Sequence, residues 1–218
     1  MKPTALDLFC GAGGASMGLH RAGFDVTGID IRPQPRYPFR FVQADALNPP
    51  FDISRFDFIW ASPPCQAYTV ANNIHQHTHP ELIEPVRSML VASRRPYAIE
   101  NVPQAPLINP VTLCGLSFGL NVKRHRKFEC SFFLLAPPCG DHKGDWVTIF
   151  GRTVLERSPA VARTLKNGPV YRRKHLGTGV GRAAMGIDWM SREELSESIP
   201  PAYSEFIGRA ALRSLSDG

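Results

Sequence analysis

The chain has 218 residues, 43% of them hydrophobic and 20% charged, and its formal net charge is +6. This length suits one sizeable hydrophobic core or a core domain with a small appendage, and no stretch approaches the ~18 consecutive apolar residues of a membrane-spanning helix. The first residues lack the apolar region and cleavage site of a signal peptide, and the five cysteines lack the spacing of a disulfide framework. We therefore expect an intracellular, cytoplasmic protein with reduced thiols.

The first hundred residues alternate between strand-like and helix-like segments. Strands are expected at Thr4–Phe9, Asp25–Asp30, Arg40–Gln43, Phe56–Ala61 and Pro96–Glu100, and helices at Gly14–Ala22 and Pro80–Arg95. Strand, helix and strand repeated in this order indicate βαβ units. We therefore predict an α/β fold with a mostly parallel central sheet and helices on both faces.

The second half has a weaker pattern. Phe128–Leu135 and Trp146–Phe150 are strand-like, and the segment after Ile199–Pro201 is expected to be helical through Leu215. Residues 151–182 contain glycines, prolines and basic residues without clear periodicity, so no element is predicted there.

Positive charge is concentrated in that same segment. Residues 151–182 carry eight basic side chains and one acidic side chain, whereas residues 1–150 carry 14 basic and 12 acidic ones. The eight basic residues are Arg152, Arg157, Arg163, Lys166, Arg172, Arg173, Lys174 and Arg182. Such a block is typical of a contact with a polyanion or of a solvated linker, and charge alone leaves both open.

A glycine-rich segment joins the first predicted strand to the first helix. It reads Asp7-Leu8-Phe9-Cys10-Gly11-Ala12-Gly13-Gly14, and glycines there let a ligand approach the backbone at a helix N-terminus that favours an anionic group. Asp30 ends the second strand and Asp45 follows the third, where a carboxylate can bind ribose hydroxyls. These residues suggest a cofactor that contains adenosine. The alternative is a tight turn with aspartates that cap helices.

Three further segments carry candidate chemistry. Ser62-Pro63-Pro64-Cys65-Gln66 follows the fourth strand and would present a thiol at the carboxyl edge of the sheet, although a free cysteine is often a buried packing residue. Glu100 and Asn101 end the fifth strand, where an acid and an amide can bind the edge of a heterocycle or cap a turn. Arg124 and Arg126 would project on one face of a strand, either to clamp a phosphate or base or to line a solvated edge.

Taken in this order, the segments resemble the DNA (cytosine-5) methyltransferases. The signatures of that family are a DLFxGxGG loop, a PCQ loop, an ENV segment, an arginine-x-arginine strand and a C-terminal closing segment, and all are recognisable between Asp7 and Arg209. The segment Ile199–Arg209 is similar to that of small members carried by actinobacteria and their phages. The resemblance implies a Rossmann-like methyltransferase that uses S-adenosylmethionine (SAM) and methylates C5 of cytosine in double-stranded DNA.

The resemblance also implies residue roles. Cys65 matches the nucleophile, Glu100 matches the acid that bonds cytosine N3, and Arg124 and Arg126 match the pair that supports the acid and the base. The implied cofactor residues are Phe9, Gly11, Gly13, Asp30, Asp45 and Pro64. The expected DNA contacts are Gln66, Asn101, Arg152, Arg172, Arg173 and Lys174.

Two residues and one region depart from the family pattern. Glu197 stands where the family has an asparagine in its closing segment, and Ile31 stands where relatives often place an aromatic residue. The region between the arginine pair and the closing segment is short, which predicts phosphate-dominated binding with short or relaxed sequence readout. We expect residues 1–135 to form the SAM-binding and catalytic domain, 136–183 a basic target-recognition insert, and 184–218 a segment that completes the catalytic domain.

Other functions stay open at this point. The same chemistry on RNA or on a free nucleotide is one, because no residue reports on recognition of a 2′-hydroxyl. A non-catalytic SAM- or DNA-binding protein, which needs a second chain for target recognition, is another. The sequence also leaves open whether methylation would serve restriction–modification or regulation.

The spacing of cysteines and histidines predicts no metal site. Cys130, Cys139, His142 and His175 are conceivable zinc ligands, but they lack a zinc-finger spacing. Cys10, Cys114 and Cys130 are expected to be packing residues. The histidines at 75, 77 and 79, which follow the Cys65 loop, are expected to face solvent or phosphate.

Overall fold

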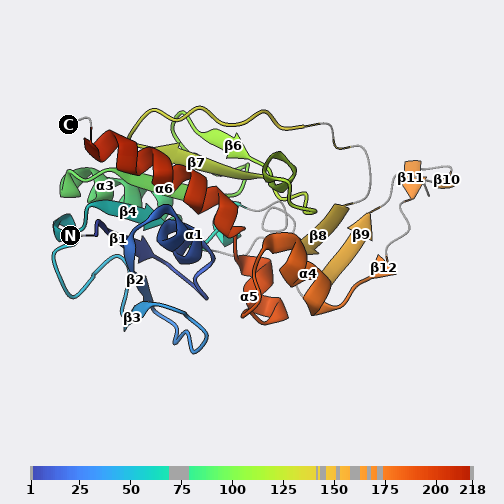
Figure 1. Cartoon of the computed structure of the whole chain (residues 1–218), viewed down its shortest axis with the longest axis horizontal. Coiled ribbons are helices and arrows are strands. Elements are labelled where there is room, and N and C mark those ends of the chain that lie inside the picture. Colours follow the sequence, from blue (N-terminus) through green and yellow to red (C-terminus); the bar gives the residue numbers. More distant parts are fainter. Residues whose placement is uncertain are drawn as a thin grey trace.

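A seven-stranded sheet forms the centre of the molecule in the computed structural model, which describes residues 2–68, 79–140, 142, 146–150, 153–157, 163–165, 168–170 and 174–216 (Figure 1). Its strands are β1 (Thr4–Leu8), β2 (Asp25–Asp30), β3 (Arg40–Gln43), β4 (Phe58–Ala61), β5 (Tyr97–Asn101), β6 (Val111–Leu113) and β7 (Arg126–Cys130). The spatial order is β3-β2-β1-β4-β5-β7-β6. The first five strands in that order run parallel, whereas β7 runs antiparallel to both β5 and β6.

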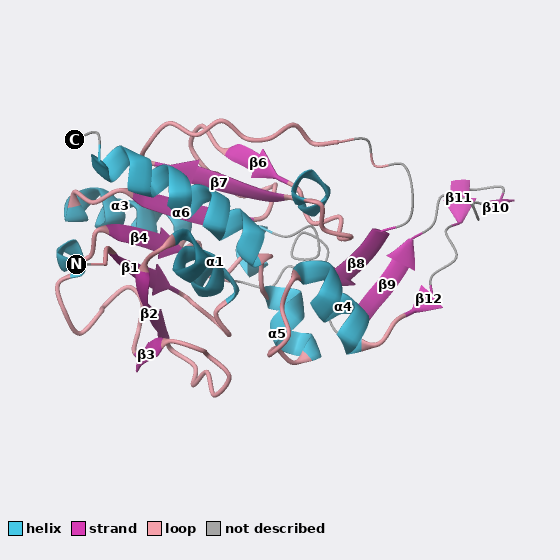
Figure 2. Ribbon diagram, in the orientation of Figure 1, coloured by secondary structure: helices cyan, strands magenta, loops and turns pink. Residues whose placement is uncertain are grey.

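Helices cover both faces of this sheet, as predicted. The two helices α1 (Gly14–Ala22) and α6 (Pro201–Ser216) pack against each other on one face (Figure 2), and α3 (Ile83–Ser93) covers the other. Strand β4 contributes to the cores on both faces of the sheet, because successive side chains of a strand point to opposite faces. Phe58 and Trp60 join the core under α1 and α6, whereas Ile59 and Ala61 join the core under α3.

A smaller antiparallel sheet lies beside the carboxyl edge of the large one, in orange in Figure 1. It contains β8 (Trp146–Phe150), β9 (Thr153–Arg157) and β12 (Lys174–His175), and two further strands, β10 (Arg163–Leu165) and β11 (Gly168–Val170), pair with each other. Two helices, α4 (Thr178–Met185) and α5 (Arg192–Glu197), pack against this sheet around a third core. That core includes Ala12 of the glycine-rich loop, whose carbonyl accepts a hydrogen bond from Trp189 Nε1 at 2.7 Å.

The predicted α/β fold is confirmed. In the first half the ends of β1, β4, β5 and α3 differ from the predicted bounds, and the larger differences, such as the unpredicted strand β6, lie in the second half. The strand predicted at Phe128–Leu135 is wrong in its bounds: β7 ends at Cys130, because its pairing with β5 ends opposite Ala98. Arg124 lies before β7 rather than within it. Four strands and the start of α4 occupy the segment for which the sequence predicts no element. The division at residues 135 and 183 stays a prediction. None of the described helices is long and apolar enough to cross a membrane.

Candidate active site

The glycine-rich loop after β1 has an open backbone surface. Phe9, Gly11 and Gly13 all have positive φ angles, of 60°, 49° and 86°. A side chain added at Gly11 would meet no heavy atom within 4 Å, so this backbone borders free space. Asp30, at the end of β2, holds the loop because its Oδ2 accepts the Gly11 amide at 3.0 Å while its Oδ1 accepts the Arg32 amide at 2.9 Å. The loop is therefore shaped before any ligand binds.

The other residues predicted for the cofactor differ in their surroundings. Ile31 beside Asp30 is an apolar side chain that is 68% exposed. Asp45 is exposed, and its carboxylate accepts hydrogen bonds from the Leu47 amide at 3.0 Å and from Asn48 Nδ2 at 3.2 Å, so it stabilises its own turn. Pro64 is exposed at the end of β4. The edge of the sheet thus offers an uncovered apolar surface next to a fixed carboxylate.

A buried carboxylate lies beneath the loop. Asp7 is fully buried at the end of β1 and accepts a hydrogen bond of 2.5 Å from Ser16 Oγ of α1. Burial is the main reason that the pKa of Asp7 rises to about 7; the charges of Asp30 and Glu100 add to the rise, and the hydrogen bond from Ser16 opposes it. The sequence offered no reason to separate this residue from the loop motif, yet it connects the first strand to the first helix.

Cys65 lies in the loop that follows β4, and a hydrogen bond from Asn101 of β5 supports this loop. The thiol is half-buried. Asn101, which is 1% exposed, donates from Nδ2 to the carbonyl of Pro63 at 2.9 Å and accepts the Val102 amide at its Oδ1 at 2.9 Å. Both polar groups of the amide are therefore used within the chain. Asn101 thus supports the loop that carries Cys65, and its contact with DNA stays a prediction.

Glu100 and Arg126 form an ion pair next to this thiol. Arg126 Nε lies 3.1 Å from Glu100 Oε1, and the Ser62 side chain also hydrogen-bonds the carboxylate. Glu100 is 8% exposed, and burial raises its pKa against the opposing effects of Arg126, Ser62 and Arg124. Partial burial likewise raises the pKa of Cys65, and so does the Glu100 charge, whereas the two arginines lower it. The four residues predicted to be catalytic thus influence one another directly.

Arg124 connects this site to the small sheet. Its Nη1 donates to the carbonyl of Ile149 in β8 at 3.0 Å, and its Nη2 donates to the carbonyl of Ser196 in α5 at 2.6 Å. The Tyr203 hydroxyl donates to the Arg124 carbonyl at 2.5 Å. Burial and the neighbouring Arg126 lower the pKa of Arg124 to about 9, and its Nε has no hydrogen-bond partner among the described residues. No spacing in the sequence signals the backbone contacts of this guanidinium.

Two ion pairs join the closing segment to the loop between β2 and β3. Glu197, at the family's asparagine position, pairs with Arg32 at 3.1 Å, and both side chains are largely exposed. Glu194 pairs with Arg36 at 2.9 Å. Glu194 also forms a capping box with Ser191 at the start of α5.

The expected DNA contacts are only partly described. Gln66 is exposed at the start of the short 3-10 helix η2 (Gln66–Tyr68). Lys174 lies in β12, where its backbone pairs with Glu156 of β9. Arg152, Arg172 and Arg173 lie outside the described residues, as do the histidines at 75 and 77.

Comparisons with known proteins support the resemblance found in the sequence. Residues 4–105 match the family model described as C-5 cytosine-specific DNA methylase. Three solved structures share the fold with a TM-score of 0.62 each: an E. coli protein assigned as a DNA modification methyltransferase encoded within a prophage (16% identity, 99% of this chain and 100% of that one), the S. pombe Dnmt2 methyltransferase (12%, 99% and 99%) and the Entamoeba histolytica methyltransferase EhMeth (14%, 99% and 99%). No curated protein matches the chain.

This family implies SAM as the cofactor, and the residues present fit it. The free space beside Gly11 accommodates a ligand that approaches the backbone closely, and the fixed Asp30 carboxylate retains lone pairs for ribose hydroxyls. The exposed Ile31 offers an apolar surface for an adenine ring. The predicted fold and cofactor are therefore consistent with the geometry of the loop.

Proposed function

Residues 4–105 belong to the C-5 cytosine-specific DNA methylase family, and on that premise we propose that the chain methylates C5 of cytosine in double-stranded DNA. One observation carries the proposal: Cys65, Glu100 and Arg126 converge at the same sheet edge as the open glycine loop. This edge is where open α/β sheets bind ligands.

Cys65 is the proposed nucleophile. Cytosine C5 is unreactive because the aromatic ring holds its electrons. Addition of the thiolate to C6 forms a C–S bond, moves the ring electrons toward C5 and N3, and makes C5 nucleophilic. SAM, when bound, supplies an electrophilic methyl group. Loss of the C5 proton to a base then returns the electrons to the ring and expels the thiolate.

Glu100 is the proposed acid at N3. Its raised pKa makes protonation easier than for a free glutamate, and the protonated carboxyl donates a hydrogen bond to N3 as charge develops on the ring. Protonation of Glu100 removes the charge that raises the pKa of Cys65, so burial alone then opposes the effect of the two arginines on the thiol. Arg126 holds the carboxyl group at 3.1 Å and thereby fixes its orientation.

DNA binding is proposed to involve the basic segment of residues 151–182. This segment carries seven more basic than acidic side chains, eight against one, and such charge binds phosphates regardless of sequence. The target base must leave the duplex stack to reach Cys65, since a stacked base is inaccessible. Binding of DNA by the single chain without methyl transfer would indicate that a second chain is needed for target recognition. The protein would be located in the compartment that holds the DNA, which is the cytoplasm of a bacterium or of a phage-infected host.

The test is a product assay with purified chain, SAM and mixed-sequence duplex DNA, followed by digestion and mass spectrometry of nucleosides. We expect 5-methylcytosine from the native chain and from a Cys130→Ala control, and none from Cys65→Ser. Cys130 is half-buried in β7 and lies outside the site, so the control removes a thiol without removing the nucleophile.

Parallel reactions on tRNA and dCMP test the alternatives. Product on either substrate but not on DNA would overturn the DNA assignment. Bound SAM without product on any substrate, and without trapping by 5-fluorocytosine DNA, would favour a non-catalytic protein or one that needs a partner.

A further inference from the structure

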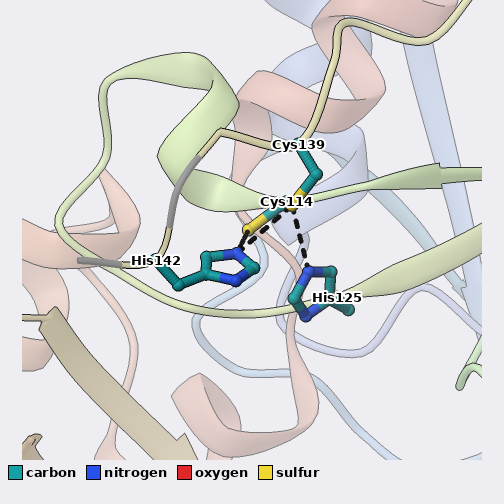
Figure 3. A group of neighbouring side chains, drawn as sticks. All are labelled: Cys114, His125, Cys139 and His142. Atoms are coloured by element: carbon teal, nitrogen blue, oxygen red, sulfur yellow. Dashed lines mark hydrogen bonds between the residues drawn. The ribbon is translucent and has the colours of Figure 1, made fainter.

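Four side chains that the sequence did not group together meet outside the active site. Cys114, His125, Cys139 and His142 place one sulfur or ring nitrogen each within 4.8 Å of all the others. Figure 3 shows the two imidazole rings and the two sulfurs turned toward one another. Cys114 is buried, His125 and His142 are half-buried, and Cys139 is exposed, so the group lies where the core reaches the surface.

The distances within the group match those between ligands of one zinc ion. Cys139 Sγ lies 3.2 Å from His142 Nε2 and 3.3 Å from His125 Nε2, and Cys114 Sγ lies 3.5 Å from His142 Nε2. Bonds of ~2.3 Å to sulfur and ~2.0–2.1 Å to nitrogen at tetrahedral angles separate sulfur and nitrogen by about 3.6 Å. The two rings, whose centroids lie 5.0 Å apart, are nearly perpendicular at 87°.

The chemical types also match. Two thiols and two imidazoles form the Cys2His2 donor set of structural zinc sites, and no carboxylate belongs to the group. Cys139 and His142 are separated by two residues, a spacing that lets one short turn present both ligands. Cys130, which the sequence brought forward as a ligand, lies in β7 and does not belong to the group.

We propose that Cys114, His125, Cys139 and His142 bind a structural Zn²⁺ ion. All four tetrahedral positions are then filled by the chain, which leaves none for a water or substrate and excludes a catalytic role for the ion. The site is independent of the proposed methyl transfer, because no member of the group belongs to the candidate active site.

The position of the site indicates what the ion would stabilise. Cys114 follows β6, His125 stands between Arg124 and Arg126, and His142 precedes β8 by four residues. Residues 131–140, which include Cys139, form no helix or strand and so have few internal hydrogen bonds to fix their path. An ion at this junction would anchor that segment and hold the small sheet next to the arginines of the active site.

Metal content is the first measurement. The full chain, produced with zinc in the medium and purified under reducing conditions without chelator, should contain about one zinc per chain by inductively coupled plasma mass spectrometry. Reconstitution of demetallated protein with Co²⁺ should give the absorption of tetrahedral cobalt with thiolate charge transfer. Absence of stoichiometric zinc together with no cobalt spectrum would overturn the proposal.

Variants assign the ligands. Cys139→Ser and His142→Asn should each lose most of the zinc and the cobalt spectrum, whereas Cys130→Ala should keep both. Cys139 and His142 are not fully buried, so these changes leave the core intact, and far-ultraviolet circular dichroism checks that the variants fold. Retention of the metal in both ligand variants, or a Cys114–Cys139 disulfide found by peptide mapping of the reduced preparation, would contradict the site.

Discussion

The two sheets of this protein hold their functional groups in different ways. The large sheet presents Asp30, Cys65 and Glu100 at the ends of parallel strands, above two cores of fully buried apolar side chains. The small sheet has one core of its own and is joined to the active site by the hydrogen bonds of Arg124 and by the segment that carries the proposed zinc ligands. The active-site residues of the large sheet are thus positioned by the ends of paired strands, whereas the small sheet is positioned by an apolar core shared with Ala12 and by a few polar contacts.

The largest effect is expected from the acid of the large sheet. Glu100→Gln removes the proton donor for N3 and should lower the rate of 5-methylcytosine formation by about 10³-fold, within the range for loss of a general acid. The same change removes a negative charge that raises the pKa of Cys65, so the thiol should become easier to ionise.

The pH dependence of Cys65 alkylation by iodoacetamide separates these effects. The midpoint should move to lower pH in Glu100→Gln, and to higher pH in Arg126→Gln, because Arg126 lowers the thiol pKa. Cys65→Ser identifies the background from the other thiols. Midpoints that move in the opposite directions would show that the site is not coupled in this way.

The next effect tests how β7 is anchored to the large sheet. Arg87 of α3 binds Glu129 of β7 through Nε at 2.8 Å and Nη2 at 2.9 Å, and both side chains are at most 10% exposed. Arg87→Leu leaves Glu129 buried and without its charge partner, which should lower the free energy of unfolding by about 3–5 kcal/mol in urea titrations. Glu84→Gln removes the other, 74% exposed partner of Arg87 and should cost less than ~1 kcal/mol. Equal losses in the two variants would mean that burial does not decide the strength of these pairs.

Metal removal should separate the two sheets. If zinc anchors the junction, a chelator should speed amide hydrogen exchange in β8 and β9 by about tenfold or more, which corresponds to ~1.4 kcal/mol of local opening, while β1, β2, β4 and β5 keep their protection. Mass-resolved exchange of the native chain measures both regions at once. Cys139→Ser, already without metal, is the matched control and should not respond to the chelator. Uniform loss of protection across both sheets would show that they unfold as one unit.

A smaller effect is expected at the support of the Cys65 loop. Asn101→Asp keeps an oxygen for the Val102 amide but loses the donor to the carbonyl of Pro63. Loss of that buried hydrogen bond should cost about 1–3 kcal/mol. Because Asn101 positions the nucleophile rather than touching the substrate, kcat should fall about tenfold or more, a change worth ~1.4 kcal/mol of activation free energy, while KM stays near its native value.

Asn109→Asp is the control for that measurement. Asn109 is exposed and outside the site, so its variant should keep the native kcat. A rise in KM with unchanged kcat for Asn101→Asp would instead place Asn101 in substrate binding, as the sequence had suggested.

The sequence was sufficient for the five parallel strands of the large sheet because their signals are local, whereas it contained no sign of β6 and predicted the wrong bounds for β7. Short apolar runs, the glycine turn and the residues after each strand all follow from neighbours along the chain, so β2, β3 and α1 match their predicted bounds. Contacts between distant segments left no such signal. The cluster of Cys114 with His125, the support of Pro63 by Asn101 and the bonds of Arg124 to β8 and α5 exist only once the chain is folded. The sequence accordingly predicts a packing role for Cys114 and no zinc site.

The smallest effect is expected where the closing segment meets the loop between β2 and β3. Arg32 and Glu197 lie 3.1 Å apart, but their side chains are 65% and 63% exposed, so water and salt screen the pair. A double-mutant cycle with Arg32→Gln and Glu197→Gln should give a coupling free energy below ~0.5 kcal/mol, which salt reduces further. Thermal unfolding of the four proteins measures stability, and titration with SAM measures affinity, which should change less than about twofold. The pair of Arg36 with Glu194 is the internal reference, because the Glu194 side chain is 18% exposed and also caps α5.

A coupling free energy above ~1 kcal/mol for Arg32 and Glu197 would contradict this prediction. Glu197 would then be a structural replacement for the family's asparagine, and the closing segment would be held mainly by the large sheet rather than by the small one.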